Sequence, residues 1–276
     1  MQSRTLIIAG MHRSGTSLIT NWLHHCGLQV GECLLEANES NKDGHFEDVE
    51  FLKIHEEILA GNGLTPSGLI FDKELKVSEY QLEKLKAIIR VKMRHFNQWG
   101  WKEPRTCLFL DTYHDLLPGA KYLIIVRDYL SVVNSLLKRV FDDMDRSYKR
   151  RSFFTRLKWT LFRKAQKRRK LYHTQAEYYV KVWIEYNLHI LNMLRLLRSE
   201  EYLVVNYSLL QKNDKQVFNY LKTIWGFDLK YFSFRNVYKE SLISRVADLE
   251  PFIKDASLLA EAKNIENEFK KYIMAD

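Results

Sequence analysis

Residues 5–17 read Thr-Leu-Ile-Ile-Ala-Gly-Met-His-Arg-Ser-Gly-Thr-Ser. The first five residues form a short apolar run, which is typical of a strand buried in a parallel sheet. The apolar residues that follow, Leu18, Trp22 and Leu23, have helical spacing. Residues 10–17 connect the two with the pattern GxxxxG plus two residues. A glycine loop between a strand and a helix predicts an anion site, because backbone N–H groups and the positive end of the helix dipole meet there.

The order of strand and helix recurs along the chain. Residues 121–126 and 202–205 predict buried strands, and helical patterns follow at 129–139 and 215–225. Strands that alternate with helices indicate a three-layer α/β/α fold with a mainly parallel sheet. Further helices are predicted at 78–97, where Ser78 and Gln81 form a capping box, and at 173–198 and 257–272. Without a clear linker or repeat, we expect a single domain, 1–276, with a basic helical insertion at about 141–172.

The positive charge is concentrated in one segment. The 276 residues are 46% hydrophobic and 13% aromatic against 28% charged, which excludes a disordered chain. The net charge is +9. Residues 146–170 hold twelve Lys or Arg and no acid. The rest of the chain has 31 of the 43 basic residues and all 34 acidic residues, so it is slightly negative. We therefore expect no nucleic-acid partner. Phe153, Phe154, Leu157, Leu161 and Phe162 have helical spacing, which predicts a cationic amphipathic helix for an anionic saccharide, lipid head group or membrane surface. A solvated helix face is the alternative.

Other features restrict the location and the chemistry. No apolar run approaches twenty residues and no signal peptide is recognisable, so we expect a cytoplasmic protein, at most peripheral to the inner face of the membrane. Cys26, Cys33 and Cys107 lack CxxC spacing, which predicts reduced thiols. No histidine pattern suggests metal ligands, and we expect no metal. The apolar stripe that includes Trp183 and Tyr186 is interpreted as core.

The loop departs from that of nucleotide triphosphatases at one position. Thr16 stands where those proteins have the lysine that reaches the β- and γ-phosphates. Arg127 follows the second predicted strand, where an aspartate would be needed for magnesium. A cation there favours a second phosphate. The two sites together predict a nucleotide with two separated anionic groups.

These motifs resemble those of the sulfotransferase family that uses 3′-phosphoadenosine 5′-phosphosulfate (PAPS). The similarity lies in Arg-Ser-Gly-Thr-Ser at 13–17, Arg127 with Ser135, Lys-Glu-Pro-Arg at 102–105 and Val-Asn-Tyr-Ser-Leu at 205–209. The four motifs have the family's order over roughly 200 residues. The motif Arg-Ser-Gly-Thr at 13–16 is most similar to that of the bacterial, carbohydrate and tyrosylprotein branches. The departures are His12, where proline is frequent, the residue after Tyr207, which is not acidic, and the lack of a basic glycine loop near the C-terminus.

The resemblance implies roles for individual residues. Arg127 and Ser135 would bind the 3′-phosphate of PAPS, and Lys102 and Arg13 would stabilise the bridging oxygen and the sulfonate. Glu47 would be the catalytic base, with His45 as the alternative; Glu47 and Asp48 could equally complement a helix N-terminus. The remaining donor-site residues that the resemblance implies are His12, Arg13, Ser14, Gly15, Thr16 and Ser17 in the loop, together with Tyr207 and Arg245.

The implied activity is metal-independent sulfuryl transfer from PAPS to a hydroxyl group, on a carbohydrate or a glycolipid. The sequence is also compatible with two other functions. One is a kinase-like P-loop phosphotransferase, which would need magnesium and ATP. The other is a non-catalytic protein that binds a polyanion or a membrane surface through residues 146–170.

Overall fold

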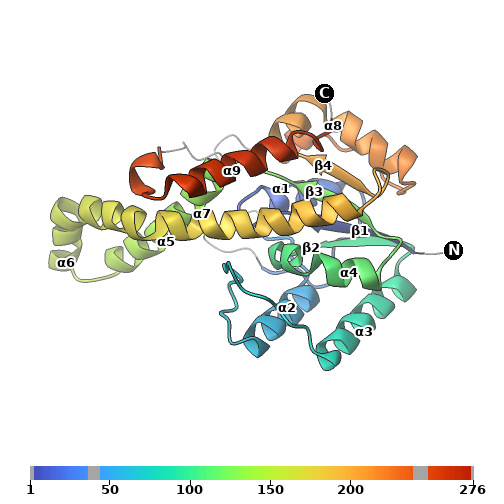
Figure 1. Cartoon of the computed structure of the whole chain (residues 1–276), viewed down its shortest axis with the longest axis horizontal. Helices are drawn as coiled ribbons and strands as arrows, with labels where there is room; N and C mark the ends of the chain where they lie inside the picture. Colours follow the sequence, from blue (N-terminus) through green and yellow to red (C-terminus); the bar gives the residue numbers. More distant parts are fainter. Residues whose placement is uncertain (1–2, 37–43, 239–247, 275–276) are drawn as a thin grey trace.

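The computed structural model describes residues 3–36, 44–238 and 248–274, and its centre is a four-stranded parallel sheet (Figure 1). The strand order is β2-β1-β3-β4, and every neighbouring pair is parallel. Three of these strands are those predicted from sequence, which confirms the α/β class. The strands are β1 (Arg4–Ala9), β2 (Gln98–Lys102), β3 (Lys121–Ile125) and β4 (Tyr202–Val205).

Helices cover both faces of the sheet because strand side chains alternate between them. Ile7, Ile124 and Val204 face one core, and Ile8 and Leu123 face the other. The first core is covered by α2 (Val49–Gly61), α3 (Glu79–His95), α4 (Leu110–Leu116), α5 (Tyr129–Lys149), α7 (Lys164–Leu196) and α9 (Ala256–Phe269). The second core is covered by α1 (Thr16–His25) and α8 (Tyr207–Asn219).

Short helical segments complete the described part of the chain. They are the 3-10 segments η1 (Pro104–Phe109), η4 (Phe234–Asn236) and η6 (Glu250–Phe252), the π-helical segments η2 (Trp159–Arg163) and η3 (Tyr220–Ile224), and the helix α6 (Phe153–Lys158). No helix within the described ranges is both long and apolar enough to cross a bilayer. Cys26, Cys33 and Cys107 are all free thiols, as predicted.

Several helix boundaries differ from the predictions. The capping box of Ser78 and Gln81 at the start of α3 is confirmed. The helix predicted at 215–225 instead begins at Tyr207, because the Asn206 side chain accepts a hydrogen bond from the Leu209 N–H and so caps α8. The helix at 129–139 continues to Lys149, and α7 begins nine residues before the predicted start. The stripe with Trp183 and Tyr186 is buried, which confirms that it is core.

The basic segment forms the end of a helical hairpin rather than one amphipathic helix. Helices α5 and α7 pack side by side and extend beyond the sheet, with α6 at the far end (Figure 1). The chain leaves α5 at Lys149 and turns through α6 and η2 into α7. The cations of residues 146–170 therefore lie on both arms of the hairpin and on its tip.

A buried lysine joins α3 to the start of α2. Lys92 Nζ lies 3.0 Å from Asp48 Oδ2, 2.6 Å from Glu50 Oε2 and 3.2 Å from Glu32 Oε2. The Asp48 side chain also accepts a hydrogen bond from the Glu50 N–H, so it caps α2. These contacts fix the backbone directly after Glu47, a candidate site residue.

We predict that Lys92→Met destabilises the protein, because it leaves the buried Asp48 carboxylate without its cation. The expected loss in the free energy of unfolding is about 3 kcal/mol, which urea denaturation measures. Lys84→Met is the matched control on the same helix, since the side chains of the Lys84 pair with Glu57 are 40% and 39% exposed, against 2% and 1% for Lys92 and Asp48. Similar losses in the two variants would contradict the anchoring role of Lys92.

Candidate active site

Two glycines shape the loop between β1 and α1. A Cβ atom on Gly10 would lie 2.6 Å from the carbonyl oxygen of Ile125, so the loop passes directly against β3. Gly15 has a φ of +93°, and a Cβ atom there would lie 2.6 Å from the Tyr207 ring. Both positions therefore require glycine. The first turn of α1 starts at Thr16, so its N–H groups are directed to the loop.

Arginines from three segments meet at this loop. Arg13 Nε donates to Ser135 Oγ at 2.8 Å, which joins the loop to α5. Arg127 Nη1 donates to the Arg13 carbonyl oxygen at 2.9 Å. Burial lowers the pKa of Arg13, and the nearby positive charges of Arg139 and Arg127 lower it further. Such crowding of like charges favours the binding of an anion among them.

A buried ion pair adjoins the loop on the side of β2. Lys102, the last residue of β2, donates from Nζ to Glu47 Oε1 at 2.8 Å and to Ser17 Oγ at 3.2 Å. His45 Nδ1 lies 4.0 Å from the same Glu47 oxygen. Burial lowers the pKa of Lys102, while Glu47 opposes that shift. Burial also lowers the pKa of His45. The fold thus brings Lys102, Glu47, His45 and the loop together.

A second buried network supports the turn after Lys102. Glu103 Oε2 lies 2.5 Å from His55 Nδ1, Arg105 Nη1 bonds to the other oxygen of Glu103, and His55 Nε2 lies 2.7 Å from the Tyr113 hydroxyl. Although burial alone would raise it, the pKa of Glu103 is lowered to about 2 by His55 and Arg105. The side chains after Lys102 are therefore fixed by charge pairs in the interior.

His12 has a different environment from the rest of the loop. Its ring meets Tyr186 edge to face at a centroid distance of 5.9 Å, and its Nε2 is buried without a hydrogen-bond partner. Burial, followed by the charge of Arg105, lowers the pKa of His12 to about 3. A neutral imidazole supplies no charge to a phosphate, so a donor-binding role for His12 stays a prediction.

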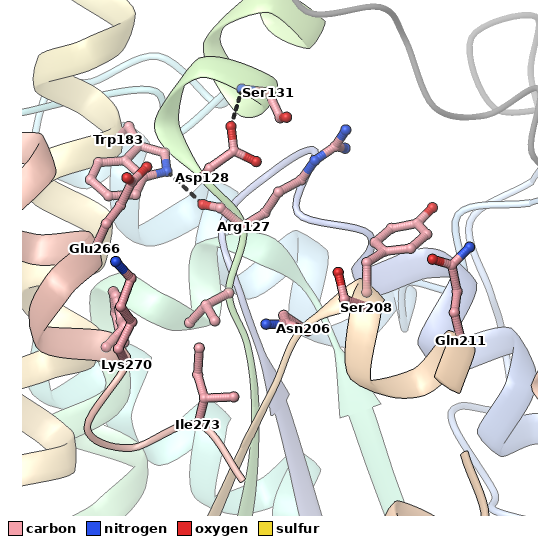
Figure 2. A pocket seen from close by; sticks show the side chains of 13 residues that line it. Arg127, Asp128, Ser131, Trp183, Asn206, Ser208, Gln211, Glu266, Lys270 and Ile273 are labelled. Atoms are coloured by element: carbon pink, nitrogen blue, oxygen red, sulfur yellow. Dashed lines mark hydrogen bonds between the residues drawn. The ribbon is translucent and has the colours of Figure 1, made fainter. Parts of the chain in front are cut away.

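A cavity of about 400 Å³ lies at the carboxyl ends of β3 and β4 (Figure 2). Trp183 Nε1 donates to the Arg127 carbonyl oxygen at 3.2 Å, and the Arg127 guanidinium lies 5.8 Å from the centroid of the Tyr207 ring. Because Arg127 lines the cavity and also bonds to the loop, it joins the two. The other polar or charged side chains at the cavity are Asp128, Ser131, Asn206, Ser208, Gln211, Glu266 and Lys270.

Several site residues were not predicted from the sequence. Arg139 lies four residues after Ser135 on α5, a spacing that places both on one helix face and could have identified it. Lys270 reaches the cavity from the end of α9, and no local motif indicates this. Arg245, predicted to act from the C-terminal region, lies outside the described residues. Within the described ranges, no group of three or more His, Cys, Asp or Glu could hold a metal ion.

Comparisons with known proteins identify the family and the fold. Residues 5–221 match the model of a family described as the sulfotransferase family. The sulfotransferase domain of the Synechococcus PCC 7002 olefin synthase is 16% identical; the alignment covers 99% of this chain and 97% of that domain, with a TM-score of 0.52. A sulfotransferase from Alicyclobacillus acidocaldarius is 14% identical over 98% of this chain and 97% of its own, with a TM-score of 0.49. No curated protein sequence matches the chain.

We predict that Gly15→Ala disrupts anion binding at the loop, because the new methyl group would meet the Tyr207 ring. With inorganic pyrophosphate as the probe, calorimetry should show an affinity loss of about tenfold or more, equivalent to at least ~1.4 kcal/mol. Gly27→Ala is the control, since Gly27 also has a positive φ, +98°, but nothing within 4 Å of its Cβ position. Equal affinities for the two variants would exclude the loop as the anion site.

Proposed function

The chain belongs to the sulfotransferase family, and we propose that it moves a sulfuryl group from PAPS to a hydroxyl group of a carbohydrate or glycolipid acceptor. The observation that carries this proposal is the convergence of cations on the loop. Four cations from four separate segments lie at or near the loop: Arg13, Arg127, Arg139 and Lys102. Glu47 pairs directly with Lys102. Such a site suits a ligand with more than one anionic group.

The proposed donor extends from the loop toward the cavity. Residues 12–17 would hold the 5′-phosphosulfate at the N-terminus of α1, as helix N-termini hold phosphates in other folds. The 3′-phosphate would bind Arg127 and Ser135. The Ser135 oxygen accepts a hydrogen bond from Arg13, which leaves its own proton to donate to a phosphate oxygen. Ser131 and Lys270 line the cavity beside Arg127 and add a hydroxyl and a cation. Tyr207 would pack against the nucleoside.

The proposed chemistry is an in-line transfer that needs a base and charge neutralisation. The acceptor oxygen attacks sulfur and loses its proton to Glu47, while the bond between sulfur and the bridging oxygen breaks. The negative charge that develops on the departing phosphate is stabilised by Lys102 and Arg13. The contact of 2.8 Å between Lys102 and Glu47 supports these roles, because it keeps the proposed base and the proposed cation next to each other. His45, whose Nδ1 lies 4.0 Å from Glu47 Oε1, is the alternative base. Burial lowers its pKa, which keeps the imidazole neutral but makes it a weaker base than an exposed histidine.

The kinase-like alternative is less well supported by the same residues. Residues 10–17 contain no lysine. The acid nearest to the end of β3, Asp128, caps α5 by accepting a hydrogen bond of 2.7 Å from the Ser131 N–H (Figure 2). The saccharide or glycolipid nature of the acceptor and the dependence on PAPS rest on the resemblance, and the cytoplasmic location rests on the sequence pattern alone. All three stay predictions.

We predict that Arg127→Ala weakens the binding of adenosine 3′,5′-bisphosphate (PAP), because it removes the cation assigned to the 3′-phosphate. Charge-assisted hydrogen bonds contribute roughly 1.5 to 3 kcal/mol, which corresponds to a loss of about ten- to a hundredfold in calorimetry. Adenosine 5′-phosphosulfate lacks the 3′-phosphate and serves as the control ligand, with little change expected. Equal losses for both nucleotides would contradict the assignment.

We predict that Lys102→Met and Glu47→Gln lower kcat by about a hundredfold or more and change donor affinity little, because both residues act on charge that develops during transfer. Burial lowers the pKa of Lys102, so the parent enzyme should lose activity as the pH rises and this lysine deprotonates. Lys102→Arg should shift that loss to higher pH. A fully active Glu47→Gln enzyme together with an inactive His45→Ala variant would transfer the role of base to His45.

A further inference from the structure

The tip of the α5–α7 hairpin has a small core of its own. Trp159 is buried, its ring stacks on Tyr148 at a centroid distance of 3.9 Å, and its Nε1 donates to Asp145 Oδ1 at 2.8 Å. Asp145 also pairs with Lys149 at 2.8 Å and with Lys164 at 3.0 Å, which ties α5 to the first residue of α7. The turn through α6 and η2 is therefore held by specific contacts.

Five large apolar side chains on this tip take no part in that core. Twelve large hydrophobic residues are exposed in the described part of the chain, and five of them lie within the ten residues 153–162. We call these five the apolar tip; their exposed fractions are 61% for Phe153, 75% for Phe154, 44% for Leu157, 62% for Leu161 and 74% for Phe162. Soluble surfaces seldom gather so many apolar groups, and such gatherings mark binding surfaces.

Cations surround the apolar tip. The twelve Lys and Arg of residues 146–170 belong to the end of α5, to α6 and η2, and to the start of α7, with no acid among them. Three of the arginines lie over aromatic rings. Arg156 is 5.7 Å from the centroid of Phe153 and Arg151 is 4.8 Å from that of Tyr148. Arg168 is 5.6 Å from the centroid of Tyr172. The acid nearest to the tip core, Asp145, is already paired. The tip therefore presents apolar groups within a strongly positive surface.

We propose that this tip docks onto a bilayer that contains anionic phospholipids. The apolar tip would enter the head-group region, and the surrounding Lys and Arg would bind lipid phosphates, as expected for interfacial helices with aromatic and cationic faces. The phosphates of a nucleic acid would bind the cations but would leave the five side chains of the apolar tip exposed to water, so a nucleic acid fits this surface less well. The end of a narrow hairpin also offers a small area for a protein partner, whereas a bilayer needs only the depth of a few side chains.

The location of the tip separates docking from catalysis. Ser135 and the tip are joined by α5, and the rise of about 1.5 Å per residue places the end of that helix about 20 Å from Ser135. Docking would therefore leave the donor loop clear of the lipid. None of the five residues of the apolar tip lies in the candidate active site. The docking proposal is therefore independent of the proposed transfer activity. A protein that fails to bind vesicles could still transfer sulfuryl groups.

Vesicle sedimentation tests the proposal with the full chain. The probes are vesicles of phosphatidylcholine alone and vesicles with about 30% phosphatidylserine, at about 0.1 M and about 0.5 M NaCl, over which surface charge becomes screened. One variant replaces all five residues of the apolar tip by serine. The matched control replaces two exposed apolar residues elsewhere, Tyr80→Ser with Ile224→Ser, whose exposed fractions are 67% and 62%. Thermal unfolding confirms that each variant is folded.

We expect the parent to bind the anionic vesicles at least about tenfold better than the neutral ones and to lose most of this binding at high salt. The apolar-tip variant should lose about tenfold or more in affinity, and the control should match the parent. Replacing Lys167, Arg168, Arg169 and Lys170 by glutamine should reduce binding to anionic vesicles and leave PAP affinity unchanged. Equal binding of parent and apolar-tip variant, no preference for anionic lipid, or tighter binding to duplex DNA than to the vesicles would each overturn the proposal.

Discussion

The loop after β1 packs tightly between β3 and the start of α8, and this packing constrains the rest of the site. Gly10 touches the backbone of β3, and Gly15 touches the ring of Tyr207 at the start of α8. Because the three strands β1, β3 and β4 are parallel and adjacent, their carboxyl ends open at one edge of the sheet. The segments that follow β3 and β4 therefore lie beside the loop. Arg127, which follows β3, and Tyr207, which follows β4, lie at the site because of this arrangement of the strands.

Buried charges hold the other half of the site, on the side of β2. Lys102 and Glu103 are consecutive and almost fully buried, yet each has its own partner, Glu47 for the lysine and His55 with Arg105 for the glutamate. Burying an ion costs several kcal/mol unless it is paired, so each partner fixes the geometry of the other. Lys92 does the same for Asp48, the residue after Glu47. The catalytic residues that we propose are therefore held on a rigid frame.

The sequence predicted the parts of this arrangement that depend on local patterns. Apolar β-branched runs identified β1, β3 and β4, but β2 reads Gln-Trp-Gly-Trp-Lys, and its burial comes from packing on Phe51 and Tyr113. The loop, Lys102 and Arg127 belong to short motifs and were found. Lys92 reaches its partners across the fold, and Lys270 lines the cavity from the end of α9; no local pattern reveals either placement. The turn at the hairpin tip, which contains no glycine or proline, depends on the stacking of Trp159 on Tyr148.

We propose that the loop and Arg127 together bind a nucleotide with separate 3′- and 5′-anions. Titration calorimetry with PAP and with ATP, each in the presence of magnesium and in the presence of a chelator, tests it most directly. We predict that PAP binds about tenfold or more tightly than ATP and that the chelator leaves its affinity unchanged. Tighter binding of ATP that depends on magnesium would contradict the account and would favour a phosphotransferase.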